Sequence, residues 1–185
     1  MGIDQNIHYQ SPLIQLGYHW TITCLAPTPE RRSVFHAFTQ RNAMTFILHP
    51  RLEADTNTLC QWPLSQVLLM NDRRFPWVIL VPRRENLVEL FDLSADDQQQ
   101  FTLESVTLAR SLKHHFQAHK MNIAALGNQV TQLHIHYIAR FTNDVAWPGP
   151  VWNSGTTERY EPSELAKQAL ALQILLKPQF EEVLP

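Results

Sequence analysis

Two histidines separated by one apolar residue constrain this chain more than any other feature. They lie in the run Gln-Leu-His-Ile-His at residues 132–136. This alternation of polar and apolar residues predicts a β-strand, in which successive side chains point to opposite faces. Gln132, His134 and His136 would share one face, and the apolar residues between them would pack against a core. The spacing therefore places two imidazoles and a carboxamide side by side on a sheet.

Several chemistries suit this pair of imidazoles. A histidine can act near neutral pH as a nucleophile, a base, an acid or a metal ligand. Two histidines on the polar face of an exposed strand are the alternative without a catalytic role. A metal site is disfavoured, because no Cys, Asp or Glu lies close in the sequence to complete the ligand shell.

The composition limits the class of protein. The 185 residues suffice for one domain with a sizeable core, and the net charge of -2 gives no basic character that would favour nucleic acid binding. With only two cysteines, Cys24 and Cys60, a disulfide framework is not expected, and a reduced, cytoplasmic compartment is the default. No run of 18 apolar residues and no secretory signal pattern are found, so we expect no membrane association.

The chain divides into three parts by pattern. Residues 1–43 are polar and irregular, and are interpreted as an N-terminal extension that is disordered, docked on the domain or non-essential. Met44 opens the first well-patterned segment and is a plausible alternative translation start. Residues 44–157 are predicted to form the main domain, and residues 158–185 a C-terminal helix and tail.

Within the domain the predicted elements alternate in type. Residues 67–70 and 77–81 are apolar runs on either side of a turn, and predict an antiparallel strand pair. Ser94 is a good N-cap for a helix with one apolar face out to about His119. Short strands are predicted at 122–125 and 133–141, and Pro162 begins the C-terminal helix. This order is typical of an α+β fold.

The segment 127–140 resembles the histidine triad (HIT) superfamily, whose signature is three alternating histidines on the last strand. Gln132 stands where the first histidine would be, and His134 and His136 match the second and third. The likeness runs from Phe46 to Trp152. It includes Val-Pro-Arg at 81–83, the segment from Leu-His-Pro-Arg-Leu at 48–52 through Asp55-Thr56, and the Ala-Trp-Pro-Gly-Pro-Val-Trp run at 146–152. It is closest to a bacterial HIT-like branch with Gln-x-His-x-His in place of the full triad.

The resemblance implies an antiparallel sheet of about five strands with one long helix and a C-terminal helix, usually in a homodimer. It implies a nucleotide hydrolase or nucleotidyl transferase that acts at the α-phosphate of a phosphoanhydride or phosphoramidate and needs no cofactor or metal. The ligand would be a nucleotide or dinucleotide. His134 would form a covalent nucleotidyl-histidine, and His136 would contact phosphoryl oxygens or protonate the leaving group. Gln132 would be the third catalytic residue.

Further nucleotide-binding residues follow from the same resemblance, and three of them have a second interpretation. Asn71 matches a position that contacts the ribose in relatives, and Gly127, Asn128 and Gln129 match a turn that presents backbone N–H groups to the phosphates. Arg140 would contact a phosphate, with a surface salt bridge or a dimer contact as the alternative. Asn71 and Asn128, and also Gln132, are equally typical of ordinary turn or surface polarity.

Some alternatives stay open at this level. Because Gln132 carries no titrating proton, the chain could be a nucleotide-binding protein with little or no turnover. A second departure is Trp77, which stands where some relatives have an extra histidine. His115 and His119 have the i, i+4 spacing of zinc ligands, but lack a third ligand, so a solvated helix end is favoured. Residues 1–43 could also serve to dock a partner.

Overall fold

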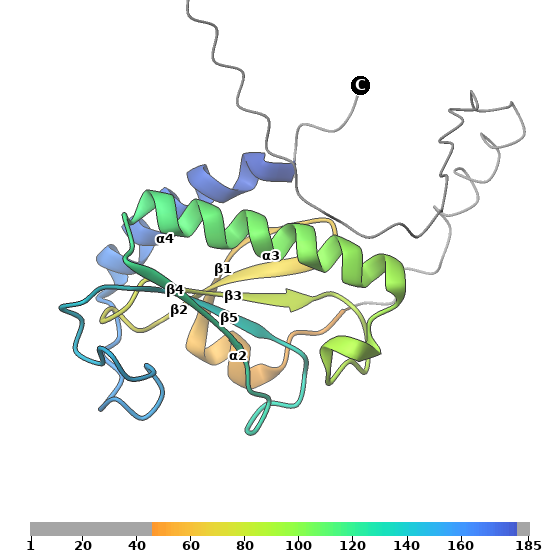
Figure 1. The fold of residues 1–185 in the computed structure, drawn as a ribbon, viewed down its shortest axis with the longest axis horizontal. Coiled ribbons are helices and arrows are strands. Elements are labelled where there is room, and N and C mark those ends of the chain that lie inside the picture. Colours follow the sequence, from red (N-terminus) through yellow and green to blue (C-terminus); the bar gives the residue numbers. More distant parts are fainter. Residues whose placement is uncertain (1–45, 181–185) are drawn as a thin grey trace, which may run out of the picture. The chain divides into compact units, whose positions relative to one another are not determined.

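The computed structural model describes residues 46–180 and contains one five-stranded antiparallel sheet with helices packed against it (Figure 1). The strand order is β1-β2-β3-β5-β4. The elements, in chain order, are α2 (Pro50–Asp55), β1 (Thr56–Gln61), β2 (Ser65–Met70), β3 (Trp77–Pro82), the 3₁₀ turn η2 (Leu90–Asp92), α3 (Ala95–His115), β4 (Lys120–Ala125), β5 (Ile135–Arg140), α4 (Pro162–Leu176) and η3 (Lys177–Phe180). The predicted α+β class and the HIT-like arrangement of elements are confirmed.

Both faces of the central strands are buried, which explains their nearly continuous apolar sequences. On one face, Val67, Leu69 and Tyr137 pack with Leu108 of α3 and Leu172 of α4. On the other face lies a second cluster, formed by Leu68, Phe75, Trp77, Ile79 and Ile138 together with flanking residues. Strands buried on both sides lose the clean alternation of polar and apolar residues that a half-exposed strand shows.

The strand register decides which residues share a face with the histidines. β3 and β5 pair antiparallel, with Ile79 opposite His136 and Trp77 opposite Ile138. Directly opposed residues on neighbouring strands point to the same face. His136 therefore lies on the face of the second cluster, beside the indole of Trp77 and away from α3.

Helix α3 begins as predicted and ends earlier than predicted. The Ser94 hydroxyl accepts a hydrogen bond from the Asp97 backbone N–H at 3.2 Å, so Ser94 is the N-cap. The helix ends at His115, because Gln117 takes a left-handed backbone conformation with φ of 52°. The prediction of a helix out to His119 was wrong, since the backbone N–H of His119 bonds instead to the carbonyl of Arg140. His115 and His119 therefore do not share one helix.

The other predicted elements have the right type with small differences in extent. The antiparallel pair at 67–70 and 77–81 is confirmed as β2 and β3, and the strand at 122–125 as β4, with two further residues at its start. The regular part of β5 begins at Ile135, two residues after the predicted start. Gln132 and His134 therefore lie just before the strand. No helix between residues 46 and 180 is long and apolar enough to cross a bilayer, and the predicted extension at 1–43 lies outside the described residues.

Candidate active site

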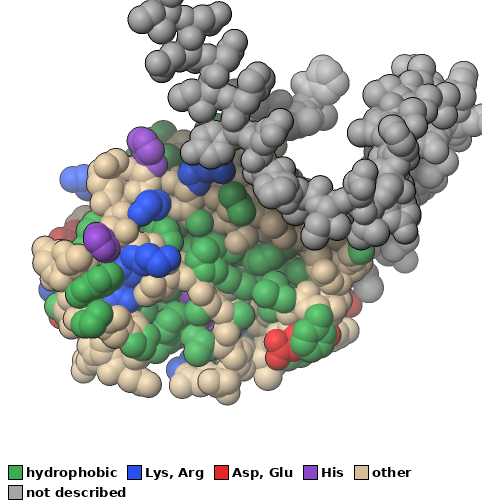
Figure 2. All heavy atoms as spheres, in the orientation of Figure 1, with side chains coloured by type: hydrophobic (Ala, Val, Ile, Leu, Met, Phe, Trp, Pro, Cys, Tyr) green, Lys and Arg blue, Asp and Glu red, His purple; other side chains and the backbone are tan. Residues whose placement is uncertain are grey.

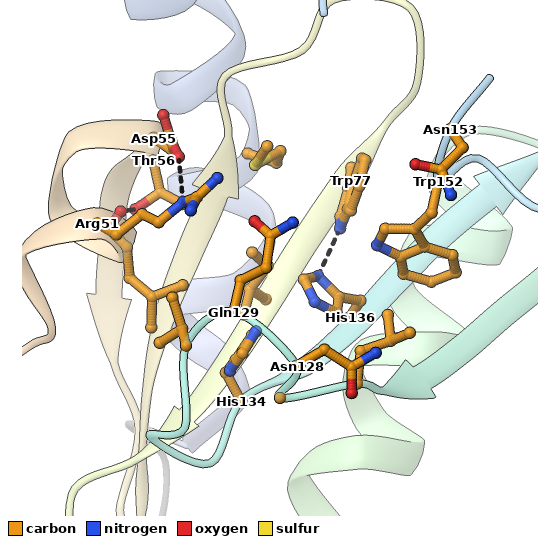
Figure 3. A pocket seen from close by; sticks show the side chains of 16 residues that line it. Arg51, Asp55, Thr56, Trp77, Asn128, Gln129, His134, His136, Trp152 and Asn153 are labelled. Atoms are coloured by element: carbon orange, nitrogen blue, oxygen red, sulfur yellow. Dashed lines mark hydrogen bonds and ion pairs between the residues drawn. The ribbon is translucent and has the colours of Figure 1, made fainter. Parts of the chain in front are cut away.

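A cavity of about 290 Å³ opens beside the first residues of β5, and both histidines line it (Figure 3). Its volume is close to the lower end of the range for small-molecule sites. Four parts of the chain meet there: α2 with the start of β1, the strands β2 and β3, the segment 126–136 that leads into β5, and the loop after β5. The lining residues are Arg51, Leu52, Asp55, Thr56, Met70, Trp77, Ile79, Leu126, Gly127, Asn128, Gln129, Val130, His134, His136, Trp152 and Asn153.

His134 is held in one tautomer by the backbone just before β5. Its Nδ1 lies 2.7 Å from the backbone carbonyl oxygen of Gln132. Because a carbonyl oxygen can only accept a hydrogen bond, Nδ1 carries the proton and Nε2 keeps its lone pair. Burial lowers the pKa of His134, partly offset by the bond to Gln132, and nearby His49 lowers it further. At neutral pH the side chain is an uncharged imidazole with a nucleophilic Nε2 at the cavity.

His136 lies among aromatic rings, and its Nδ1 accepts a hydrogen bond from the indole N–H of Trp77 at 3.0 Å. The ring of Trp152 lies on it in a T-shaped contact, with centroids 5.4 Å apart, and the ring of His134 lies 4.8 Å away. Burial, with a smaller effect from His134, lowers the pKa of His136 to about 3. Figure 3 shows His136 between the labelled Trp77 and His134. Both imidazoles are thus neutral at pH 7.

The turn before β5 forms another wall of the cavity. Gly127, Asn128 and Gln129 all line it, and Gly127 has a φ of 69°. This backbone conformation is one that residues with a Cβ rarely adopt, and an added Cβ would otherwise meet only an ordinary contact 3.8 Å away. The glycine is therefore required by the path of the backbone. The three predicted turn residues and the two histidines lie together, which makes five of the eight residues singled out from the sequence.

Gln132 lies elsewhere, and its carboxamide has partners of its own. Its Oε1 accepts from the backbone N–H of His49 at 2.8 Å, and its Nε2 donates to the carbonyl of Ile47 at 2.9 Å. It does not line the cavity. The side chain therefore ties the segment before α2 to the start of β5.

Asn71 and Arg140 also lie off the cavity lining. Asn71 Oδ1 accepts from the backbone N–H of Tyr160 at 3.0 Å and so connects β2 to the segment before α4. The guanidinium of Arg140, 1% exposed, donates to both carboxylate oxygens of Asp144 and to the Oδ1 of Asn122. The salt bridge that the sequence offered as an alternative for Arg140 is present, and it is buried.

Several lining residues were missed from the sequence. Trp77 was noted only as a departure from some relatives, and Trp152 was interpreted as packing against a core or a partner. Trp152 does pack on the second cluster, and it also lines the cavity. Arg51 and Asp55 form an ion pair at 3.8 Å on α2. Both come from the segment 48–56, whose likeness to the family was the available signal.

No three His, Cys, Asp or Glu side chains gather between residues 46 and 180 in a way that could hold a metal ion. What the cavity offers is a neutral nucleophilic nitrogen, a second imidazole beside it, and a glycine turn opposite. This combination suits attack on an electrophilic centre that is held by polar groups.

Comparison with known proteins agrees with this geometry. The HIT domain model matches residues 51–143. A histidine triad protein from Marinobacter aquaeolei is 46% identical, with a TM-score of 0.70, over 71% of this chain and 96% of that one. One from Sinorhizobium meliloti is 45% identical, with a TM-score of 0.69, over 71% and 98%.

A more distant structure shares the fold alone. The diadenosine triphosphate hydrolase of Plasmodium falciparum is 16% identical, with a TM-score of 0.51, over 66% of this chain and 78% of that one. No curated protein matches. The family model and the close bacterial structures, together with the His-x-His site that the fold builds, show that this chain belongs to the histidine triad family.

Proposed function

We propose that this protein is a nucleotide hydrolase or nucleotidyl transferase that reacts at an α-phosphate through a covalent intermediate on His134. The observation that carries the proposal is the bond from His134 Nδ1 to the Gln132 carbonyl, which leaves the Nε2 lone pair available at the cavity. The family also includes a hydrolase of a dinucleoside polyphosphate. A neutral imidazole is a competent nucleophile at pH 7, and a covalent intermediate divides one difficult displacement into two.

The reaction would proceed in two displacements. In the first, His134 Nε2 forms a bond to the α-phosphorus while the bond from phosphorus to the leaving-group oxygen breaks. In the second, water or another acceptor attacks the same phosphorus and the bond to Nε2 breaks, which restores the imidazole. The backbone of the turn at 127–129 and the Nε2–H of His136 would stabilise charge on the phosphoryl oxygens.

Gln132 favours turnover over binding alone. The position of the missing histidine does not contribute to the cavity lining, so the carboxamide there removes no proton donor or acceptor from the site. At the site, residue 132 contributes the backbone carbonyl that bonds to His134 Nδ1, and any residue supplies such a carbonyl. We therefore assign Gln132 a positioning role, in which it fixes the segment 47–49 and the start of β5.

Trapping of the intermediate tests the proposal. Protein incubated with a dinucleoside polyphosphate labelled at the α-phosphate, then quenched in base, should carry one label that is released by mild acid. His134→Ala should carry none, while Gln132→Ala should still be labelled. Label that persists in His134→Ala would contradict the proposal. Thermal stabilisation by nucleotide without label or product over hours would instead identify a binding protein.

We also propose that two copies associate along β4. This strand lies at the edge of the sheet formed by the described strands, and an unpaired edge is a template for another strand. Ile123 of β4 and Leu126 after it are 49% and 43% exposed. Figure 2 shows hydrophobic side chains across the middle of the face seen in Figure 1. Light scattering should give twice the chain mass for the wild-type protein. Ile123→Glu should reduce the measured mass to that of one chain.

A further inference from the structure

The indole of Trp77 makes one contact that determines how His136 can act. It donates from Nε1 to Nδ1 of His136 at 3.0 Å, and both side chains are nearly buried, at 5% and 7% exposure. An indole N–H is a donor only, so Nδ1 of His136 must offer a lone pair. A neutral imidazole has one protonated nitrogen, which is then Nε2. Trp77, on the neighbouring strand β3, thus decides which nitrogen of His136 carries the proton.

We propose that Trp77 locks His136 as a neutral Nε2–H donor, so that the site binds the phosphoryl group but gives no proton to the leaving group. This inference rests on the proposed function and names its substrate class. A second proton on His136 would have to reside on Nδ1, directly against the indole N–H. That cation would be formed only by breaking the bond to Trp77, in a buried place next to another imidazole.

The surroundings supply no other proton donor among the described lining residues. His134 is the nucleophile and must be unprotonated at Nε2. Arg51 and Asp55 are engaged with one another at 3.8 Å, and Asp55 also accepts from Arg159 at 2.9 Å. Of the groups packed on His136, Trp77, Trp152 and Ile79 do not titrate near neutral pH. Burial that lowers the pKa of His136 to about 3 agrees with a ring that stays neutral.

Because His136 gives no proton to the leaving group, the chemistry of the leaving group determines which substrates react. When a phosphoanhydride is attacked, the bond from phosphorus to the bridging oxygen breaks and the leaving phosphate takes the electron pair as a stable anion, without a proton. When an alkyl phosphoramidate is attacked, the nitrogen must acquire a proton before or as its bond to phosphorus breaks. General acid catalysis is worth about 10²–10⁴-fold in rate. The preferred substrates are therefore nucleotide anhydrides such as dinucleoside polyphosphates.

Imidazole NMR tests the lock without requiring activity. In protein labelled with ¹⁵N histidine, and with His136→Gln for assignment, Nδ1 of His136 should resonate as an unprotonated nitrogen and Nε2 as a protonated one from pH 8 to 5. Trp77→Phe should release the lock, giving mixed tautomers or titration in that range. Trp152→Phe is the matched control, because Trp152 contacts His136 at the same centroid separation of 5.4 Å and should not alter the tautomer. A protonated Nδ1 in the wild type, or no change in Trp77→Phe, would overturn the lock.

Kinetics test the substrate class. The wild-type protein should have a kcat/KM for a dinucleoside triphosphate at least about 100-fold above that for the matched alkyl phosphoramidate. Trp77→Phe should reduce this ratio about tenfold or more, and Trp152→Phe should not. An equal preference, or a ratio that Trp77→Phe leaves unchanged, would overturn the assignment of substrates. If neither compound is turned over while the NMR pattern is as expected, the proposed function and its substrate preference fail and the lock stands.

Discussion

The two ends of strand β5 bury polar side chains to opposite effect. At its start, His134 and His136 are each 7% exposed and border a cavity. At its end, Arg140 is 1% exposed, and its guanidinium is surrounded by acceptors from Asp144 and Asn122. The polar side chains at both ends are buried, but only those at the start of the strand border a cavity. A buried polar group marks a reactive site when part of its bonding capacity faces a cavity, and marks a scaffold when each of its polar atoms is bonded within the protein.

The scaffold end also shows how the protein stabilises a buried charge. Burial works to raise the pKa of Asp144, but hydrogen bonds from Arg140 and from the backbone N–H groups of Phe141 and Ala146 hold it below the usual value. Each nitrogen of the Arg140 guanidinium and each carboxylate oxygen of Asp144 thereby has a hydrogen-bond partner. At the reactive end the protein solves the same problem differently, by keeping both imidazoles neutral.

The largest effect is expected at the reactive end. His134→Ala should lower kcat/KM by at least about 10³-fold, because no other nucleophile takes its place. The free energy of unfolding should change by less than about 1 kcal/mol, since the ring borders a cavity. Steady-state kinetics and urea denaturation measure the two quantities. A loss of stability that matches the loss of activity would remove the distinction between the two ends of β5.

The reverse outcome is expected at the scaffold end. Arg140→Met should lower the free energy of unfolding by about 3–5 kcal/mol, because it leaves the carboxylate of Asp144 buried without its partner. Arg73→Met is the matched control: its ion pair with Glu158 has the same 2.7 Å separation, but both side chains are more than half exposed. The control should change stability by less than about 1 kcal/mol. Folded Arg140→Met should keep its activity at low temperature.

Acid should act chiefly through the reactive end. His136 has a pKa of about 3 in the folded protein and an ordinary value of 6.5 when unfolded, so the unfolded chain binds more protons between these values. Stability is therefore full above pH 6.5 and is lost as the pH falls toward 3. His136→Gln should reduce the slope of unfolding free energy against pH by about 1.4 kcal/mol per unit between pH 6 and 4. An unchanged slope would contradict a neutral buried His136.

The smallest effect is expected for Gln132. Gln132→Ala removes two hydrogen bonds to the backbone of residues 47 and 49, which should cost about 1–2 kcal/mol in thermal or urea unfolding. Its kcat/KM should fall less than about tenfold, because the carboxamide is not at the cavity. Gln132→His should bind nucleotide like the wild type and gain little activity. A gain of 100-fold or more would show that the missing histidine limits catalysis.

Local patterns predicted the elements of this fold better than their limits or their contacts. The alternation around His134 and the apolar runs of β2 and β3 identified the strands, because the period of side chains is a local property. The end of α3 was missed since Gln117, a residue without special preference, takes the left-handed conformation that stops the helix. After this turn the backbone N–H of His119 bonds to the carbonyl of Arg140, a contact between distant residues that is not visible in the sequence.

In the candidate site, too, residues close together in the sequence were predicted, and residues from distant elements were missed. The histidines and the glycine turn lie together because one short stretch of chain carries them. Trp77 and Asp55 reach the cavity through strand register and the packing of α2, which a single sequence does not reveal. Asn71, Gln132 and Arg140 are polar residues at the sequence positions that the resemblance indicates, yet each makes its hydrogen bonds away from the cavity. Residue type alone does not show whether a polar side chain lines the cavity or stabilises the fold.

The bonds of Gln132 determine how far the chain can be shortened from its N-terminus. Both partners, the carbonyl of Ile47 and the N–H of His49, come after Met44. A protein that starts at Met44 would retain them, whereas one that starts at Pro50 would lose both, along with the side-chain cap that His49 gives α2 through the N–H of Arg51. Translation from Met44 would thus yield a chain that keeps both hydrogen bonds of Gln132 and the His49 cap on α2.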